Sequence, residues 1–287
     1  MVNSLINGVS TGLNMADKYR FAFGKNWRAF LKGLTTVQIQ EAEKSLQEAL
    51  ESRHLSGFRF LDAGSGSGLF SLAARRLGAN VHSFDFDKEC VACTSELKWR
   101  YDRGNRRWHV ERGSVLDKNY MLSLGEFDVI YSWGVLHHTG DMWKALDHIQ
   151  IPAKPGALLY IAIYNDQGVI SRIWRRIKRI YVSSPAGRSL ILTVFLPHFF
   201  FRAVIAGIVK YRSPLRYFRD YRQKRGMSIW HDWIDWLGGY PFQVARPEEI
   251  MDFFQSKGFV LTQLKRTRRM GCNEFVFKKT ASSRAAR

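Results

Sequence analysis

The chain has 287 residues, of which 46% are hydrophobic and 14% aromatic, so a disordered chain is excluded. Three cysteines exclude a disulfide-stapled secreted scaffold, and the N-terminus lacks a signal-peptide pattern, so we expect a cytoplasmic protein or one that faces the cytosol. The formal net charge is +19. Residues 171–226 contain fourteen Lys or Arg against one acid, and residues 265–287 contain eight against one. Such basic segments suit phosphate-bearing partners, either nucleic acid or an anionic membrane.

Strands alternate with helices along most of the chain. Thr35 and Gln38 form a capping-box pattern that opens a helix. The expected strands are 58–63, 80–85, 108–112, 127–132, 157–163, 259–264 and 274–277, and the expected helices between them are 69–77, 88–99, 142–149 and one opened by Pro247. This order predicts an α/β fold, a doubly wound, seven-stranded, mostly parallel sheet with an antiparallel last strand.

The pattern of the sheet breaks between residues 165 and 246. We therefore predict three parts, an N-terminal helical cap (1–55), a core (56–165 and 246–280) and a large helical insertion after strand five (166–245).

A glycine-rich turn, LDAGSGSG at residues 61–68, follows the first strand. Glycine permits a tight turn and close approach of the backbone to a ligand, and the helix that follows offers unpaired N–H groups. Asp85 ends the second strand, seventeen residues after Gly68, where an acid can accept hydrogen bonds from ribose hydroxyls. The spacing differs from the dinucleotide fingerprint, and the lack of a following Lys-Ser/Thr excludes a P-loop.

These motifs resemble those of the class I, seven-stranded S-adenosylmethionine-dependent methyltransferases, and look most like the small-molecule and quinone O-methyltransferases. The resemblance covers roughly residues 58–163 and 247–278, and its segments FLDAGSGSG, HSFDFD, GSVLD and FDVIYSWGVLHH follow the family's order. It implies S-adenosyl-L-methionine as the cofactor and no metal. The cofactor-binding residues that it implies are Asp62, Gly64, Ser65, Gly66, Gly68, Asp85, Phe86, Ser114, Val115, Ser132 and Trp133. Ser114 stands where many members carry Asp, so Asp117 or backbone groups are alternatives for reading adenine.

Transfer of a methyl group to oxygen or nitrogen is an in-line displacement that also needs a base for the acceptor's proton. His137 and His138 follow the fourth-strand loop that the family places near the methyl group, and they are the first candidates. Tyr164 and His231 are rivals for the same catalytic role. Cys90 and Cys93 lack a second ligand pair, so we expect no zinc site there.

The insertion contains an amphipathic stretch, SRIWRRIKRIY, with Ile173, Trp174, Ile177 and Ile180 expected on one face. Residues 190–209 follow, with Arg202 as their only charge, and they nearly qualify as a membrane span. A helical pair in the membrane interface, a soluble lid or oligomer contact, and a true span all stay open. Three tryptophans at 230, 233 and 236 are expected to form an aromatic wall over an acceptor or a packed lid. Residues 19–31 are a second candidate lid, with Asn26 and Trp27 as contacts.

The sequence thus predicts a methyltransferase whose acceptor is the oxygen, or less favourably the nitrogen, of a small-molecule or lipid-linked compound. Residues 171–226 are the expected peripheral contact with an anionic membrane on its cytosolic face. An RNA methyltransferase that binds nucleic acid through the same basic segments is the alternative, and a cofactor-binding interaction protein is a third interpretation. The sequence does not define the oligomeric state.

Overall fold

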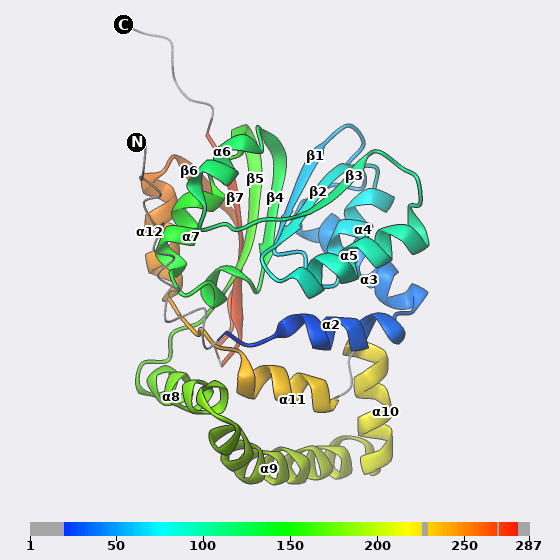
Figure 1. Ribbon diagram of the computed structural model, residues 1–287, viewed down its shortest axis with the longest axis vertical. Helices are drawn as coiled ribbons and strands as arrows, with labels where there is room; N and C mark the ends of the chain where they lie inside the picture. Colours follow the sequence, from blue (N-terminus) through cyan, green and yellow to red (C-terminus); the bar gives the residue numbers. More distant parts are fainter. Residues whose placement is uncertain (1–19, 226–228, 269, 281–287) are drawn as a thin grey trace, which may run out of the picture.

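A seven-stranded sheet forms the centre of the protein in the computed structural model, which describes residues 20–225, 229–268 and 270–280 (Figure 1). The strands are β1 (Arg59–Ala63), β2 (Asn80–Asp85), β3 (Trp108–Arg112), β4 (Phe127–Trp133), β5 (Ala153–Tyr164), β6 (Phe259–Lys265) and β7 (Cys272–Lys279). Their order is β3-β2-β1-β4-β5-β7-β6. The strands from β3 to β5 pair in parallel, whereas β7 is antiparallel to both of its neighbours. The predicted fold class and its antiparallel last strand are confirmed.

Helices cover both faces of the sheet and its lower edge in Figure 1. They are α2 (Phe23–Lys32), α3 (Thr36–Ala49), α4 (Leu69–Arg76), α5 (Lys88–Tyr101), α6 (Lys118–Ser123), the short 3-10 helix η1 (Leu136–His138), α7 (Met142–Ile149), α8 (Val169–Ser183), α9 (Pro185–Tyr211), α10 (Pro214–Arg225), α11 (Ile229–Gly238) and α12 (Pro247–Ser256). The predicted capping box opens α3, because the backbone N–H of Thr35 donates to Oε1 of Gln38 at 2.7 Å.

Two apolar layers hold the helices to the sheet. One layer contains Leu61 and Ile130, which pack with α6, α7 and α12. The other contains Phe60 and Val129, which pack with α3, α4 and α5. Since successive residues of β1 and β4 point to opposite faces and both faces are buried, these strands are continuous apolar runs. Helix α3 and, through Phe30 and Leu31, helix α2 both belong to the second layer, and α2 also lies across the end of the sheet (Figure 1).

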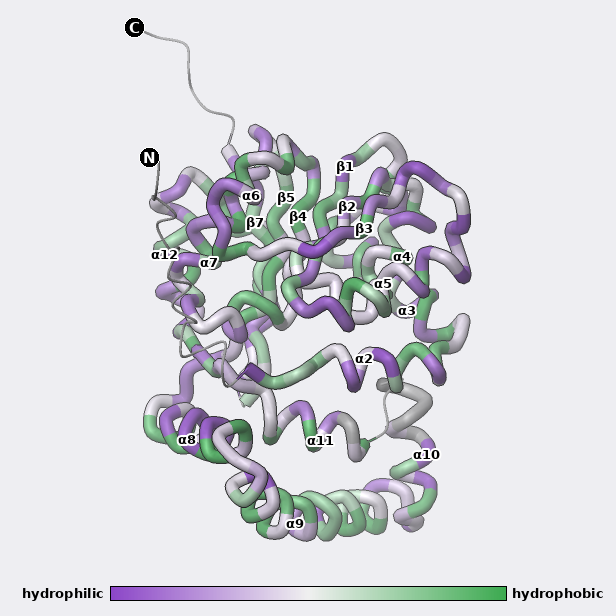
Figure 2. The backbone as a smooth tube through the Cα atoms, viewed as in Figure 1, coloured by the Kyte–Doolittle hydropathy of each residue, from purple (hydrophilic) through white to green (hydrophobic). Residues whose placement is uncertain are grey.

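Helices α8 to α11 form the insertion, and they lie beyond the carboxyl ends of the parallel strands, with α11 between α2 and α9 (Figure 1). Helix α9 runs for 27 residues through Pro197. Within the part of the chain that the structure describes, it is the one helix long and apolar enough to cross a membrane. Of its most apolar stretch, 17% is buried inside the protein. Figure 2 shows hydrophobic residues along much of its length.

The two faces of α8 differ from the prediction. Trp174 and Ile177 are partly buried in a small cluster with α9 and α11, and Tyr181 is buried in the same cluster. Ile173 and Ile180 instead face solvent, at 50% and 43% exposure. The apolar residues expected on one face of α8 are therefore divided between the cluster and solvent. A helix that packs against two neighbours buries a stripe with a spacing of three and four residues, and here that stripe runs through Trp174 and Tyr181.

Candidate active site

A cavity of about 910 Å³ lies at the carboxyl ends of β1, β2 and β4. The glycine-rich turn and the ends of these strands line one side of it, and residues of α2, α9 and α11 line the other. Ligands of doubly wound folds bind at this edge, where the strand order reverses from β1. The volume is near the upper end of the range for small-molecule sites, about 300–1,000 Å³.

The glycine-rich turn brings backbone into the cavity between β1 and α4. Gly64 and Gly66 have φ angles of +87° and +54°, which side-chain-bearing residues rarely adopt. A Cβ on Gly64 would lie 2.4 Å from Val135, and one on Gly66 would lie 3.0 Å from the indole nitrogen of Trp27. Both turn residues and Ser65 line the cavity, whereas Gly68 does not. Gly68 instead permits close packing, because its Cβ would lie 2.9 Å from the Cα of Thr94.

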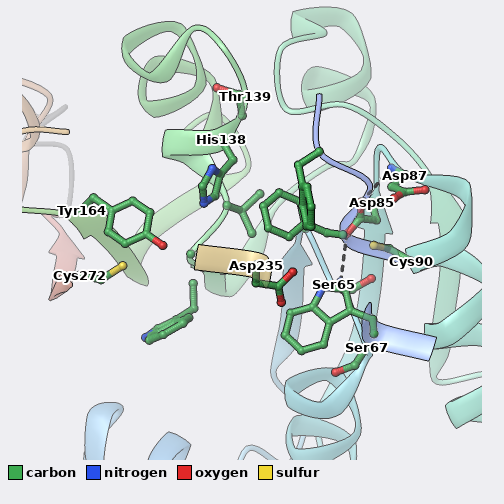
Figure 3. A pocket seen from close by; sticks show the side chains of 18 of the residues that line it. Ser65, Ser67, Asp85, Asp87, Cys90, His138, Thr139, Tyr164, Asp235 and Cys272 are labelled. Carbon is green, nitrogen blue, oxygen red and sulfur yellow. Dashed lines mark hydrogen bonds between the residues drawn. The ribbon is translucent and has the colours of Figure 1, made fainter. Parts of the chain in front are cut away.

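Two carboxylates, the buried Asp62 and the half-buried Asp85, line the cavity beside this turn. Oδ2 of Asp85 accepts from the backbone N–H of Gly66 at 3.0 Å, and its Oδ1 accepts from that of Asp87 at 2.9 Å (Figure 3). Burial raises the pKa of Asp85 to about 6 and that of Asp62 to about 7. Asp62 accepts a hydrogen bond from the hydroxyl of Ser71. Asp85 is thus fixed in place with lone pairs that still reach the cavity.

The candidates for the adenine end, Phe86, Ser114 and Val115, also line the cavity. The Arg20 guanidinium lies over the Phe86 ring, 4.7 Å from its centroid. The hydroxyl of Ser114 accepts from the backbone N–H of Leu116 at 3.2 Å. Asp117 is outside the lining and caps α6, where its carboxylate accepts from the backbone N–H of Tyr120. The structure therefore gives Asp117 a capping role.

At the end of β4, neighbouring residues have different roles. Trp133 lines the cavity, whereas Ser132 is fully buried outside it. The hydroxyl of Ser132 donates to the carbonyl oxygen of Ala63 at 2.8 Å and joins β4 to β1. The assignment of Ser132 as a cofactor contact is thus replaced by a structural role.

Of the candidate bases, His138 and Tyr164 line the cavity, with ring centroids 5.5 Å apart (Figure 3). Nδ1 of His138 lies 2.6 Å from the carbonyl oxygen of Pro241. Because a carbonyl only accepts, Nδ1 carries the proton and Nε2 is an acceptor. Burial lowers the pKa of His138 to about 3. His138 is therefore a neutral hydrogen-bond acceptor in the pH range of life.

His137, the first candidate base, is fully buried and is outside the cavity lining. Its ring packs on that of Tyr164, at 4.1 Å between centroids, and burial holds its pKa well below the usual value. We therefore correct this assignment, since an acceptor in the cavity does not reach His137. The side chain of His231 lies outside the residues that the structure describes.

Asp235 of α11 is a cavity residue that sequence reasoning did not single out. Its carboxylate points into the cavity between His138 and Ser65 (Figure 3). Nδ2 of Asn26 donates a hydrogen bond to Oδ1 of Asp235. Burial raises the pKa of Asp235 to about 7. The available signal was an acid within the tryptophan-rich helix. Of the three tryptophans expected there, Trp233 and Trp236 line the cavity, whereas Trp230 is 50% exposed.

Potential metal ligands also occur away from the cavity. Among the described residues, the ligating atoms of His82, His109 and Glu111 lie within 4.8 Å of one another on β2 and β3. Glu111 lies 2.9 Å from Nε2 of His82 and 3.3 Å from Nε2 of His109, and it accepts from the hydroxyl of Tyr120 at 2.7 Å. These contacts form a hydrogen-bond network that pairs the carboxylate oxygens of Glu111. Cys90 and Cys93 are free thiols in α5.

The strand order, the glycine-rich turn after β1 and the acid at the end of β2 define a class I methyltransferase. The family model of the methyltransferase domain matches residues 35–259, and the chain belongs to this family. It is a methyltransferase that depends on S-adenosylmethionine. The residues in place fit this cofactor, since the turn at Gly64 and Gly66 lines the cavity with backbone and Asp85 offers carboxylate lone pairs beside it.

Solved structures with the same fold include a magnesium protoporphyrin IX methyltransferase from Synechocystis PCC 6803 with bound S-adenosylhomocysteine. It has a TM-score of 0.55 and 13% identity, over 92% of this chain and 98% of that one. An O-methyltransferase family protein from Burkholderia thailandensis has a TM-score of 0.50 and 12% identity, over 85% of this chain and 58% of that one.

Curated relatives include proteins named ubiquinone biosynthesis O-methyltransferase. The one from Bradyrhizobium sp. (strain ORS 278) is 26% identical over 138 residues, which are 46% of this chain and 50% of that protein. The one from Brucella ovis is 31% identical over 121 residues, which are 39% of this chain and 44% of that protein. The chain thus spans half or less of the length of these relatives.

Proposed function

We propose that this methyltransferase transfers a methyl group to an oxygen of an amphiphilic acceptor, a small molecule or a lipid-linked compound, at the surface of an anionic membrane. The observation that carries the proposal is the position of α9. One side of this helix lines the cavity, and the opposite side presents large apolar residues to solvent.

The cavity-lining side of α9 is polar and aromatic. It consists of Phe195, His198, Phe199 and Arg202, whose spacing of three or four residues places them on one face. The outer side consists of Leu190, Val194, Phe201, Ile205 and Ile208, which are between 53% and 63% exposed. Exposed apolar surface of this extent marks an interaction site. If the outer side of α9 binds a membrane, the cavity lies directly behind this helix. An acceptor that leaves the membrane then reaches the cavity over a short distance.

The charge near α9 supports an anionic membrane as the partner. Helix α8 exposes Arg172, Arg176 and Arg179 beside its outward Ile173 and Ile180. Mixed apolar and basic surfaces bind the interface of anionic bilayers, because the apolar side chains insert and the basic ones attract the head groups. Residues 171–226 of the insertion carry fourteen basic residues and one acid.

The names of the relatives favour oxygen as the acceptor atom, and the cavity is compatible with it. The curated relatives described above are named as O-methyltransferases. The cavity also places two hydrogen-bond acceptors, Nε2 of His138 and the carboxylate of Asp235, opposite the glycine-rich turn (Figure 3). Acceptors of this kind orient a hydroxyl group, whose hydrogen they receive.

The protein contributes to the reaction by positioning the two ligands and by excluding water from the cavity. When bound, S-adenosylmethionine supplies a methyl carbon made electrophilic by a positive sulfur. Gly64, Gly66 and Asp85 hold that ligand at the end of β1 and β2, and His138 and Tyr164 orient the acceptor. Helices α2 and α11 cover the site, and removal of water together with alignment of the reacting atoms meets most of the barrier of such a displacement.

Incubation of the full-length protein with S-adenosylmethionine labelled in its methyl group tests this proposal. Separate reactions contain a membrane-lipid extract, total RNA or a water-soluble metabolite extract. We expect label in the lipid extract, in a product that is stable to base as an ether is. An Asp85→Ala variant, whose cofactor site is impaired, is the blank. Label that enters RNA alone would favour nucleic acid as the acceptor and contradict the proposal.

A further inference from the structure

We infer that Asp235 is the general base of the methyl transfer and that its Oδ2 takes the proton of the acceptor's hydroxyl group. This inference rests on the proposed function, since it needs an acceptor with an ionisable hydroxyl. Asp235 belongs neither to the glycine-rich turn nor to the loop after the fourth strand. It is supplied by α11 of the insertion.

The two carboxylate oxygens of Asp235 have different surroundings. Oδ1 accepts a hydrogen bond from Nδ2 of Asn26, which lies on α2. This is the hydrogen bond that the described part of the structure gives the carboxylate, and it occupies Oδ1, while the carboxylate as a whole lines the cavity (Figure 3). The carboxylate lies between the turn that holds Ser65 and the acceptor-side residue His138 (Figure 3). A hydroxyl directed at the methyl carbon from the acceptor side is therefore within the space that Asp235 faces.

The surroundings of Asp235 tune its basicity. Burial raises its pKa to about 7, the hydrogen bond from Asn26 lowers it, the charge of Asp232 on the same helix raises it, and that of Lys178 on α8 lowers it. The other ionisable groups that line the cavity come from both of its sides, and they are Arg20, Asp62, Asp85, Asp87, Cys90, Tyr131, His138, Tyr164, His198, Arg202, Asp232 and Cys272. A base is most effective when its pKa is close to the working pH, which Asp235 satisfies.

His138 does not satisfy the same requirement. With a pKa of about 3, its Nε2 is a weak base, although it accepts a hydrogen bond well. The two residues thus divide the work on one hydroxyl group. His138 orients it, and Asp235 removes its proton.

The step balances without a further reactant. The acceptor's oxygen forms a bond to the methyl carbon while the bond from that carbon to the positive sulfur breaks, and the sulfur keeps the electron pair. The hydroxyl proton moves to Oδ2 of Asp235. Release of that proton to water after the products leave restores the carboxylate.

An Asp235→Asn variant tests the inference, because it keeps the shape of the side chain and removes its basicity. The probe is a catechol with a long alkyl chain, presented in vesicles of phosphatidylglycerol and phosphatidylcholine. We expect kcat to fall by about 10²–10⁴-fold, the contribution typical of a general base, with an unchanged Kd for S-adenosylmethionine. The wild-type kcat should rise with pH around 7, and the variant should lose this acidic limb. Asp252→Asn, on the exposed side of α12, is the matched control.

Chemical rescue separates a base from a structural residue. In Asp235→Ala, added formate should restore part of kcat in proportion to its concentration, an effect that a packing defect does not show. If Asp235→Asn keeps kcat within a few-fold and keeps the acidic limb, the inference is overturned and the proposed function stands. If the wild type methylates neither the alkyl catechol nor a lipid extract, the proposed function fails and the inference falls with it.

Discussion

Asn26 of α2 donates a hydrogen bond from Nδ2 to Oδ1 of Asp235 of α11, across 209 residues of the chain. The N-terminal segment and the insertion therefore meet over the cavity and complete one wall. Neither segment belongs to the strands that hold the cofactor motifs. The acceptor half of the site thus depends on contacts that are far apart in the sequence.

Asn26→Ala should move the acidic limb of the pH profile of kcat upward by about one pH unit. The hydrogen bond from Asn26 stabilises the charged carboxylate of Asp235 and lowers its pKa, so its loss raises that pKa. Hydrogen bonds to charged groups contribute about 1.5–3 kcal/mol, and one pH unit corresponds to about 1.4 kcal/mol. At pH 7 the variant should be several-fold slower, and at pH 9 it should approach the wild type. Equal loss at both pH values would show that Asn26 acts on packing alone.

Asp85→Ala should weaken binding of S-adenosylmethionine by roughly 10–100-fold, the effect of a lost hydrogen bond to a charged group. Calorimetry on the purified protein measures it. Because the pKa of Asp85 is about 6, the wild-type affinity should also fall as the pH drops below 6 and the carboxylate becomes protonated. Asp117→Ala is the control, since it removes a helix cap of about 1 kcal/mol and should leave the affinity within two-fold. Wild-type affinity in a folded Asp85→Ala protein would contradict the cofactor site.

Lys178→Met should stabilise the protein more at pH 6 than at pH 9. Lys178 is fully buried, donates to the carbonyl oxygen of Trp236, and burial lowers its pKa to about 7. Below pH 7 the ammonium is charged in both the folded and the unfolded state, so its burial costs most there. Between pH 7 and the ordinary value of 10.5 the folded state loses the proton first, and the cost declines.

Denaturant unfolding of the wild type and of Lys178→Met at both pH values measures this difference. We expect the gain in free energy of unfolding to be about 2 kcal/mol larger at pH 6. A gain that is equal at the two pH values would mean that Lys178 keeps its proton in the folded state over this range.

The core of the fold and the cofactor half of the site could be predicted because their signals are local. Gly64 and Gly66 are needed at a turn that strand and helix define within a few residues, and Asp85 ends the next strand. Which of His137 and His138 faces the cavity is not determined by the residues near them in the sequence. Both belong to the 3-10 turn η1, in which neighbouring side chains point about 120° apart, and only the packing of Tyr164 and Pro241 decides which faces the cavity.

The position of Asp235 in the cavity and the burial of Lys178 on α8 escaped prediction for a similar reason. Periodicity shows that a helix is amphipathic, but a helix with several neighbours has several faces. Lys178 appeared to belong to a solvated face of α8, and it lies instead beneath α11, over the rings of Trp236 and Phe242. The position of α11 depends on α2 and α9 together.

The outer side of α9 should hold the protein on anionic vesicles at high salt. Attraction of the basic residues fades as the Debye length shrinks from about 10 Å at 0.1 M to about 3 Å at 1 M, whereas inserted apolar side chains keep their contribution. A Phe201→Ser and Ile205→Ser double variant should therefore bind vesicles at 0.1 M salt and dissociate at 1 M. Val37→Ser on α3, at the same 60% exposure as Ile205, is the matched control and should behave as the wild type. Co-sedimentation with phosphatidylglycerol vesicles measures retention. A wild-type protein that dissociates completely at 1 M salt would show that charge alone holds it, and would remove the apolar side of α9 from the membrane contact.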